Sequence, residues 1–158
     1  LFISLHANAS PSPEASGAET YYLSLPRAAK TDAERLGGHE TAALISRPDE
    51  ADPLQMILWD MAQSQWLAES SVLAERIQAD FNETLGIPDR GVKQAPFRIL
   101  VGATMPAILV EIGFISNRDE ERRLRDPRFL DTIVDSLSRS IDAYRARSQD
   151  SSWGRGDP

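Results

Sequence analysis

Hydrophobic residues recur every three or four positions in two parts of the chain, the pattern of helices with one buried face. In the first part they are Leu54, Ile57, Leu58, Met61, Ala62, Leu73, Ile77 and Phe81. Asp52 suits the N-cap of this helix, Pro53 its first position, and Gly86 with Pro88 its end. The second helix starts at Pro127 and carries Phe129, Ile133, Leu137, Ile141 and Tyr144.

Short apolar, β-prone runs predict strands at residues 1–6, 20–24, 97–101 and 107–112. The run at 107–112 is unbroken, which indicates burial on both faces. A short helix is expected from Asn117 or Arg118 to Leu124. Strands that alternate with helices predict an α/β fold built on a layered sheet.

Polar and glycine-containing stretches separate these elements. Residues 10–17 have the composition of a loop. Residues 25–52 are weakly patterned: 28–36 could form a helix, but Gly37 and Gly38 interrupt it, so we interpret this stretch as an insertion over one end of the core. Residues 148–158 are predicted to be a disordered tail, which leaves one domain over 1–147.

Composition narrows the classes of function. The net charge of -7 and pI of about 4.8 argue against a nucleic-acid binder. With no cysteine, disulfides, thiol catalysis and cysteine-based zinc sites are excluded. No apolar run approaches the roughly 20 residues of a membrane span, and no charged segment precedes the first apolar run as in a signal peptide. Because that run starts at Leu1 with no cap or turn before it, we expect a fragment.

Catalytic residues of α/β sheets gather beyond the carboxyl ends of the strands. Two candidates occupy such positions, His6 after the first strand and Glu111 near the end of 107–112. A strand-end histidine suits Zn²⁺, although most histidines are not ligands and a hydrogen-bonded surface or core residue is the alternative. A buried carboxylate needs a partner, so Glu111 is either in a salt bridge with Arg or Lys or a general acid or base.

Four blocks of sequence sharpen this hypothesis. They are residues 2–8 (Phe-Ile-Ser-Leu-His-Ala-Asn), 17–22 (Gly-Ala-Glu-Thr-Tyr-Tyr), 90–97 (Arg-Gly-Val-Lys-Gln-Ala-Pro-Phe) and 105–117 (Met-Pro-Ala-Ile-Leu-Val-Glu-Ile-Gly-Phe-Ile-Ser-Asn). In this order they closely resemble the zinc-dependent N-acetylmuramoyl-L-alanine amidases of the AmiA/B/C and CwlV type. The resemblance extends from Leu1 to about Tyr144, and the last block is highly specific.

The resemblance implies a mixed sheet flanked by helices in three layers, with Zn²⁺ held by two histidines and a glutamate. His6 matches one zinc ligand and Glu111 the catalytic carboxylate. The other two ligands belong to blocks expected upstream of Leu1, so the fragment alone is expected to be inactive. His39 is not expected to replace them, because it lies in the insertion beside Gly37 and Gly38.

Further matches are Asn8 and a loop expected at residues 90–94, with Arg90, Lys93 and Gln94. These residues either contact substrate or support the metal site, and a capped turn is the alternative. The activity implied is hydrolysis of the amide bond between N-acetylmuramic acid and L-alanine of peptidoglycan, in the periplasm or outside the cell, for wall remodelling or daughter cell separation. A non-catalytic peptidoglycan-binding or regulatory module is the first alternative, disfavoured by the presence of both His6 and Glu111. Another metallohydrolase, such as a carboxypeptidase, is disfavoured by the block at 111–117.

Some members of the family carry a helix within the insertion that occludes the zinc until an activator protein displaces it. In residues 25–52 the carboxylates of Glu34 and Glu40 could cap the metal in this way. The competing interpretation is a solvated surface helix, favoured slightly because Gly37 and Gly38 weaken any helix.

Overall fold

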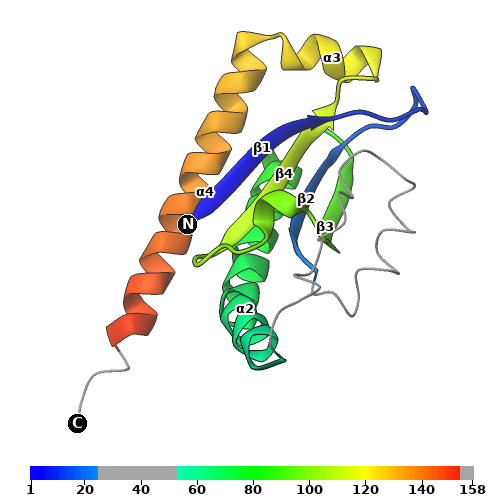
Figure 1. The fold of residues 1–158 in the computed structure, drawn as a ribbon. Helices are drawn as coiled ribbons and strands as arrows, with labels where there is room; N and C mark the ends of the chain where they lie inside the picture. The colour runs from blue at the N-terminus through cyan, green and yellow to red at the C-terminus, as the bar shows by residue number, and fades with distance from the viewer. Residues whose placement is uncertain (25–52, 154–158) are drawn as a thin grey trace.

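The computed structural model describes the backbone of residues 1–24 and 53–153. It describes the side chains of the same residues except 53–63, 65 and 149–153. Its centre is a four-stranded mixed sheet in the order β1-β4-β2-β3 (Figure 1). The strands are β1 (Phe2–Asn8), β2 (Ala18–Leu23), β3 (Asp89–Ala95) and β4 (Ala107–Phe114). β1 runs parallel to β4, β2 runs antiparallel to β4, and β3 runs parallel to β2.

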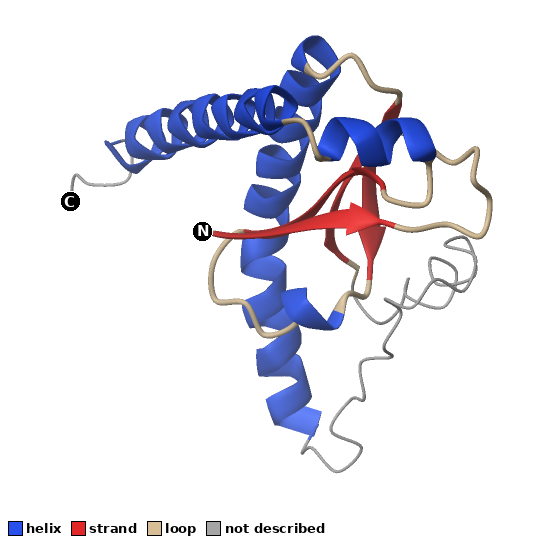
Figure 2. Ribbon diagram, turned by 90° about the horizontal axis from the view of Figure 1, so that it is seen from above, coloured by secondary structure: helices blue, strands red, loops and turns tan. Residues whose placement is uncertain are grey.

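The long helices match the hydrophobic periodicity. α2 (Pro53–Thr84) and α4 (Pro127–Trp153) begin at the two prolines predicted to open them. The short helix α3 (Arg118–Leu124) is also confirmed, with the Asn117 side chain accepting hydrogen bonds from two backbone N–H groups of its first turn. α3 lies just beyond the carboxyl end of β4 (Figures 1 and 2).

Alternation of side chains along β4 divides the core into two clusters. Ile108, Val110 and Ile112 pack with residues of α2 and α4 on one face: Leu73, Ile77, Phe81 and Ile133. Ala107 and Leu109 belong to the cluster of the opposite face, with Tyr21, Leu23, Phe97 and Leu100. The predicted mixed sheet flanked by helices is therefore confirmed. Glu111 continues the series 107, 109, 111 on the face opposite Ile108, Val110 and Ile112.

Two local predictions are wrong. Residues 97–101 are not a strand but contain the 3₁₀ helix η1 (Arg98–Leu100). Its N-cap Phe97 and its last residue Leu100, three positions apart, are both buried. Residues 90–94, matched as a loop, lie in β3. β3 escaped prediction because it has few apolar residues and is held mainly by backbone pairing with β2.

Other bounds differ by a few residues. β1 and β4 run to Asn8 and Phe114, beyond the predicted 6 and 112, and β2 begins at Ala18. α4 continues past Ser148 to Trp153, where a disordered tail was predicted. The predicted helix at 28–36 and the candidates Glu34, His39 and Glu40 lie outside the described residues. None of the helices in the described ranges is long and apolar enough to cross a membrane.

Candidate active site

Three polar side chains occupy neighbouring positions across the sheet. His6 in β1 is the register partner of Glu111 in β4, and Glu111 is in turn the partner of Glu19 in β2. Directly paired residues present their side chains on the same face, with Cβ atoms about 5 Å apart. The two residues singled out from the sequence therefore lie side by side, on the face opposite the core cluster formed with Leu73, Ile77 and Phe81 of α2.

Glu111 is buried without an ion-pair partner among the described residues. The residue is 5% exposed, and its Oε2 atom has no hydrogen-bond partner among them. Burial, reinforced by the negative charge of Glu19, raises the pKa of the Glu111 carboxyl to about 7. The salt-bridge interpretation thus finds no support in this part of the chain, and the environment is that of a carboxyl able to gain and lose a proton near neutrality.

Glu19 is as deeply buried but fully hydrogen-bonded. Its Oε1 accepts from Asn8 Nδ2 at 2.9 Å and from the Tyr21 hydroxyl at 2.8 Å, and its Oε2 accepts from Arg90 Nε at 2.8 Å and from Lys93 Nζ. Burial alone would raise the pKa of Glu19, but the hydrogen bonds from Lys93, Arg90 and Tyr21 outweigh it and hold that pKa below its usual value. Glu19 is therefore a stable carboxylate anion.

Sequence reasoning assigned no role to Glu19, although it lies in one of the matched blocks. The available signal was the same one that singled out Glu111. Glu19 is an acidic residue directly before the β-prone run at 20–24, and five of the six residues of the observed strand β2 are buried. What the run could not show is which cations surround it.

The predicted substrate contacts are only partly brought together. Asn8, Arg90 and Lys93 converge on Glu19, the last two from β3. An irregularity in the pairing of β2 with β3 falls at Glu19, as in a β-bulge that redirects side chains. Gln94 is not brought to Glu19, because its register partner Tyr22 packs with the cluster on the opposite face of the sheet.

His6 has the surroundings of a metal ligand, but a metal site is incomplete. The Ser4 hydroxyl and His6 Nε2 are hydrogen-bonded at 2.8 Å, and the other ring nitrogen has no hydrogen-bond partner among the described residues. A bond that fixes one nitrogen and leaves the other available is the usual arrangement of metal-binding histidines. However, no group of three or more His, Asp or Glu residues in the described ranges could hold a metal ion.

Glu120 of α3 fastens the two strands that carry the acidic pair. Its Oε1 accepts from the Gly17 N–H, just before β2, and its Oε2 accepts from the Phe114 N–H at the end of β4, both at 2.7 Å. A side chain at Gly17, with a φ of +107°, would place its Cβ 2.2 Å from the Pro88 carbonyl oxygen. The glycine therefore allows the close approach of the loop to the segment before β3.

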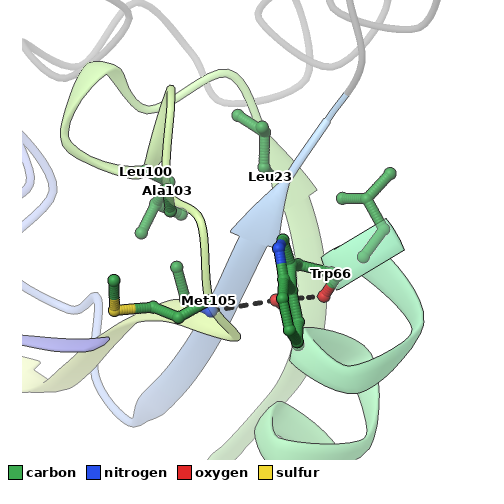
Figure 3. A pocket seen from close by; sticks show the side chains of 8 residues that line it. Leu23, Trp66, Leu100, Ala103 and Met105 are labelled. Carbon is green, nitrogen blue, oxygen red and sulfur yellow. Dashed lines mark hydrogen bonds between the residues drawn. The ribbon is translucent and has the colours of Figure 1, made fainter. Parts of the chain in front are cut away.

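An apolar pocket lies at the other end of β4. Leu23, Trp66, Leu100, Ala103 and Met105 line it, with Ser70 bridging the Trp66 carbonyl and the Ala107 N–H (Figure 3). It contains no charged group and only about 10 Å³ of space. This hollow is too small for a substrate and is separate from His6 and Glu111.

Fold and site define an α/β domain whose carboxyl–imidazole pair lies at the ends of two parallel strands. Residues 1–143 match the family model for N-acetylmuramoyl-L-alanine amidase (Amidase_3), and the chain belongs to this family. The amidase AmiC of Escherichia coli O6:H1 is 32% identical over 149 residues, which cover 92% of this chain and 36% of AmiC. AmiA of Escherichia coli K12 is 30% identical over 148 residues, covering 91% and 51%.

Solved structures agree with the fold. The catalytic domain of the amidase CwlV from Bacillus (Paenibacillus) polymyxa var. colistinus superposes with a TM-score of 0.59 at 26% identity, covering 92% of this chain and 57% of that one. An amidase from Clostridium difficile 630 gives a TM-score of 0.62 at 22% identity, covering 91% and 56%. The chain thus spans roughly a third to a little over half of the length of these relatives.

Proposed function

We propose that the protein to which this chain belongs hydrolyses the amide bond between N-acetylmuramic acid and L-alanine in peptidoglycan. Membership of the amidase family supports the substrate class. Because the chain covers 36% of AmiC and 51% of AmiA, the activity is proposed for the full-length protein. A peptidoglycan substrate implies action in the periplasm or outside the cell, in wall remodelling or daughter cell separation.

The observation that carries this proposal is the environment of Glu111. A buried carboxyl with an unpaired oxygen and a pKa of about 7 can take a proton from an attacking water and return it to the leaving L-alanine nitrogen. His6, the register partner of Glu111 in β1, would supply an imidazole ligand to the metal of this chemistry. Its hydrogen bond to Ser4 holds the orientation of the ring.

Zinc is part of the proposal. Catalytic zinc has three protein ligands, and the described residues fit one of them, His6. The family resemblance implies that the other two are a histidine and a glutamate, which would come from outside the described residues. When bound, zinc would lower the pKa of a water molecule and polarise the scissile carbonyl. The part of Glu111 is proton transfer, because its carboxyl is buried and protonates near neutral pH.

For residues 25–52 the favoured interpretation is a solvated surface helix, and autoinhibition is the alternative. Glu34 and Glu40 would cap the metal until an activator protein displaces the segment that carries them. Deleting residues 27–48 from the full-length enzyme should then raise its basal activity. Unchanged or lower activity would discard autoinhibition while leaving the amidase proposal in place.

Digestion of purified peptidoglycan followed by mass spectrometry tests the activity. We expect free stem peptides from the full-length, zinc-loaded protein. Glu111→Gln should retain zinc, measured by elemental analysis, while hydrolysis falls by about 10²–10⁴-fold, the usual contribution of a general acid or base. Glu121→Gln, which removes an exposed carboxylate on α3, is the matched control and should keep normal turnover.

Three outcomes would count against the proposal. Shortened stems still attached to the glycan would indicate a carboxypeptidase. No cleavage would indicate a binding module. Normal turnover by Glu111→Gln would remove this residue from the mechanism.

A further inference from the structure

A pair of half-exposed cations lies beside the acidic residues. Arg90 is 37% and Lys93 34% exposed at the side chain, and both bind the same oxygen of Glu19. Two positive charges therefore pair with one buried carboxylate, that of Glu19. Glu111 forms no ion pair with either cation. One positive charge is left over at a position that solvent and ligands can reach.

Both cations are held in place but keep unused hydrogen-bond donors. Arg90 donates through Nε to Glu19, and its guanidinium carbon lies 5.0 Å from the ring centroid of Phe114. Its two terminal NH₂ groups have no hydrogen-bond partner among the described residues. Lys93 Nζ donates to Glu19 and lies 5.8 Å from the ring centroid of Tyr21.

This arrangement suits a carboxylate. A guanidinium presents parallel N–H donors that match the two oxygens of a carboxylate, and charge-assisted bonds of this kind are about twice as strong as neutral ones. Because Glu19 and the two aromatic rings already orient the cations, little side-chain entropy is lost when an anion binds. Glu19 is thus a positioning residue for the cations.

The distance from Glu111 indicates which carboxylate would be bound. Adjacent strands lie about 4.8 Å apart, and the cations of β3 reach Glu19, on the strand next to that of Glu111. An extended peptide advances by about 3.5 Å per residue. With the scissile bond of L-alanine at Glu111, the cations fall within reach of the next residue of the stem peptide.

We propose that Arg90 and Lys93, positioned by Glu19, bind the free α-carboxylate of D-isoglutamate, the second residue of the stem peptide. This inference rests on the proposed amidase function and adds a specificity to it. The enzyme would favour peptidoglycan in which this carboxylate is free over peptidoglycan in which it is amidated, because an amide carries no charge to pair with the cations.

Two synthetic substrates isolate this one group. They are muramyl tripeptides with L-lysine in the third position, which differ only in a free or an amidated α-carboxyl of the second residue. For the full-length, zinc-loaded enzyme we expect a KM about tenfold lower for the free acid, the size of one charge-assisted hydrogen bond. The kcat should differ much less, since the carboxylate is remote from the reacting atoms.

Variants of the cations complete the test. Arg90→Gln and Lys93→Gln should each bring the KM ratio of the two substrates towards one, while Lys93→Arg should keep most of the preference. Arg125→Gln removes an exposed arginine that pairs with Glu121 on α3 and should leave the ratio unchanged. Because the readout is a ratio between substrates, a general loss of active enzyme does not mimic the expected result.

The outcomes separate the two proposals. Cleavage of neither substrate would refute the amidase function itself. Cleavage of both with equal KM by the unaltered enzyme, or an unchanged preference in Arg90→Gln and Lys93→Gln, would refute only the carboxylate-binding role.

Discussion

Glu19 and Glu111 are register partners on adjacent antiparallel strands and are 3% and 5% exposed, yet their surroundings are opposite. Glu19 accepts four hydrogen bonds, two of them from cations, and its pKa is lowered. Glu111 has an oxygen with no partner among the described residues, and its pKa is raised to about 7.

The comparison shows that burial alone does not set the charge of a carboxyl. Burial raises the pKa of both residues, but only Glu19 has donors that reverse the effect. The negative charge so fixed on Glu19 then opposes ionisation of Glu111. A pair of acids with separated pKa values is the usual basis for distinct roles at a catalytic site.

The largest effect on stability is expected for Glu19→Ala. It removes the acceptor of Asn8, Tyr21, Arg90 and Lys93 and should destabilise the complete amidase domain by about 3 kcal/mol, the range for breaking a buried, paired charge. Urea denaturation measures the change. Glu121→Ala, which breaks an exposed ion pair, should cost under about 0.5 kcal/mol, and similar losses for both variants would contradict the special status of Glu19.

Glu111→Gln should have a stability effect that depends on pH. Since folding raises the pKa of Glu111 from 4.5 to about 7, the folded state binds the proton more tightly than the unfolded state. The resulting stability is present in full below pH 4.5 and is lost as the pH rises through 7. The uncharged glutamine avoids this loss, so the variant should match the unaltered metal-free protein at acid pH.

At about pH 8 the same variant should be more stable than the unaltered protein, by on the order of 2 kcal/mol. Thermal unfolding of the metal-free domain over a series of pH values would measure the difference. A constant difference across the series would show that the Glu111 carboxyl is not perturbed.

Glu120→Gln tests how the two acidic residues are kept in register. The amide cannot accept from both the Gly17 and Phe114 N–H groups without turning a donor towards one of them. We expect a loss of about 1–2 kcal/mol in unfolding free energy, the cost of one unsatisfied buried group. Amide hydrogen exchange should accelerate at Gly17 and Phe114. Unchanged exchange at both residues would argue against the role of Glu120 in joining β2 and β4.

Tyr21→Phe tests the contribution of a single hydrogen bond to the Glu19 carboxylate. It removes one of the four donors to Glu19 while keeping the edge-to-face contact of the ring with Phe97 at 4.9 Å. A loss of about 1 kcal/mol is expected from urea denaturation, because three donors remain. Tyr144→Phe removes an exposed hydrogen bond to Glu69 and should change stability by less than about 0.5 kcal/mol.

The elements predicted correctly are those whose apolar residues are spaced so that one or both faces are visibly buried. In α4, Ile133 and Leu137 are four positions apart because this helix buries one face. In β4, the apolar run is unbroken because both faces of the strand are buried. β3 and η1 were assigned wrongly, because β3 is specified by backbone pairing with β2, and the apolar residues of η1 suit a strand as well as a tight turn.

The sequence by itself determined that an imidazole and a carboxylate, His6 and Glu111, stand near the carboxyl ends of two strands, because strand-forming runs show where strands end. Only the tertiary structure decided which of two buried acids is paired. Arg90 and Lys93 lie 71 and 74 positions from Glu19 in the chain. The order of the strands and the irregular pairing of β2 with β3 bring their charges to Glu19 and leave Glu111 without them. A local hydrophobic pattern does not show which distant strands become neighbours.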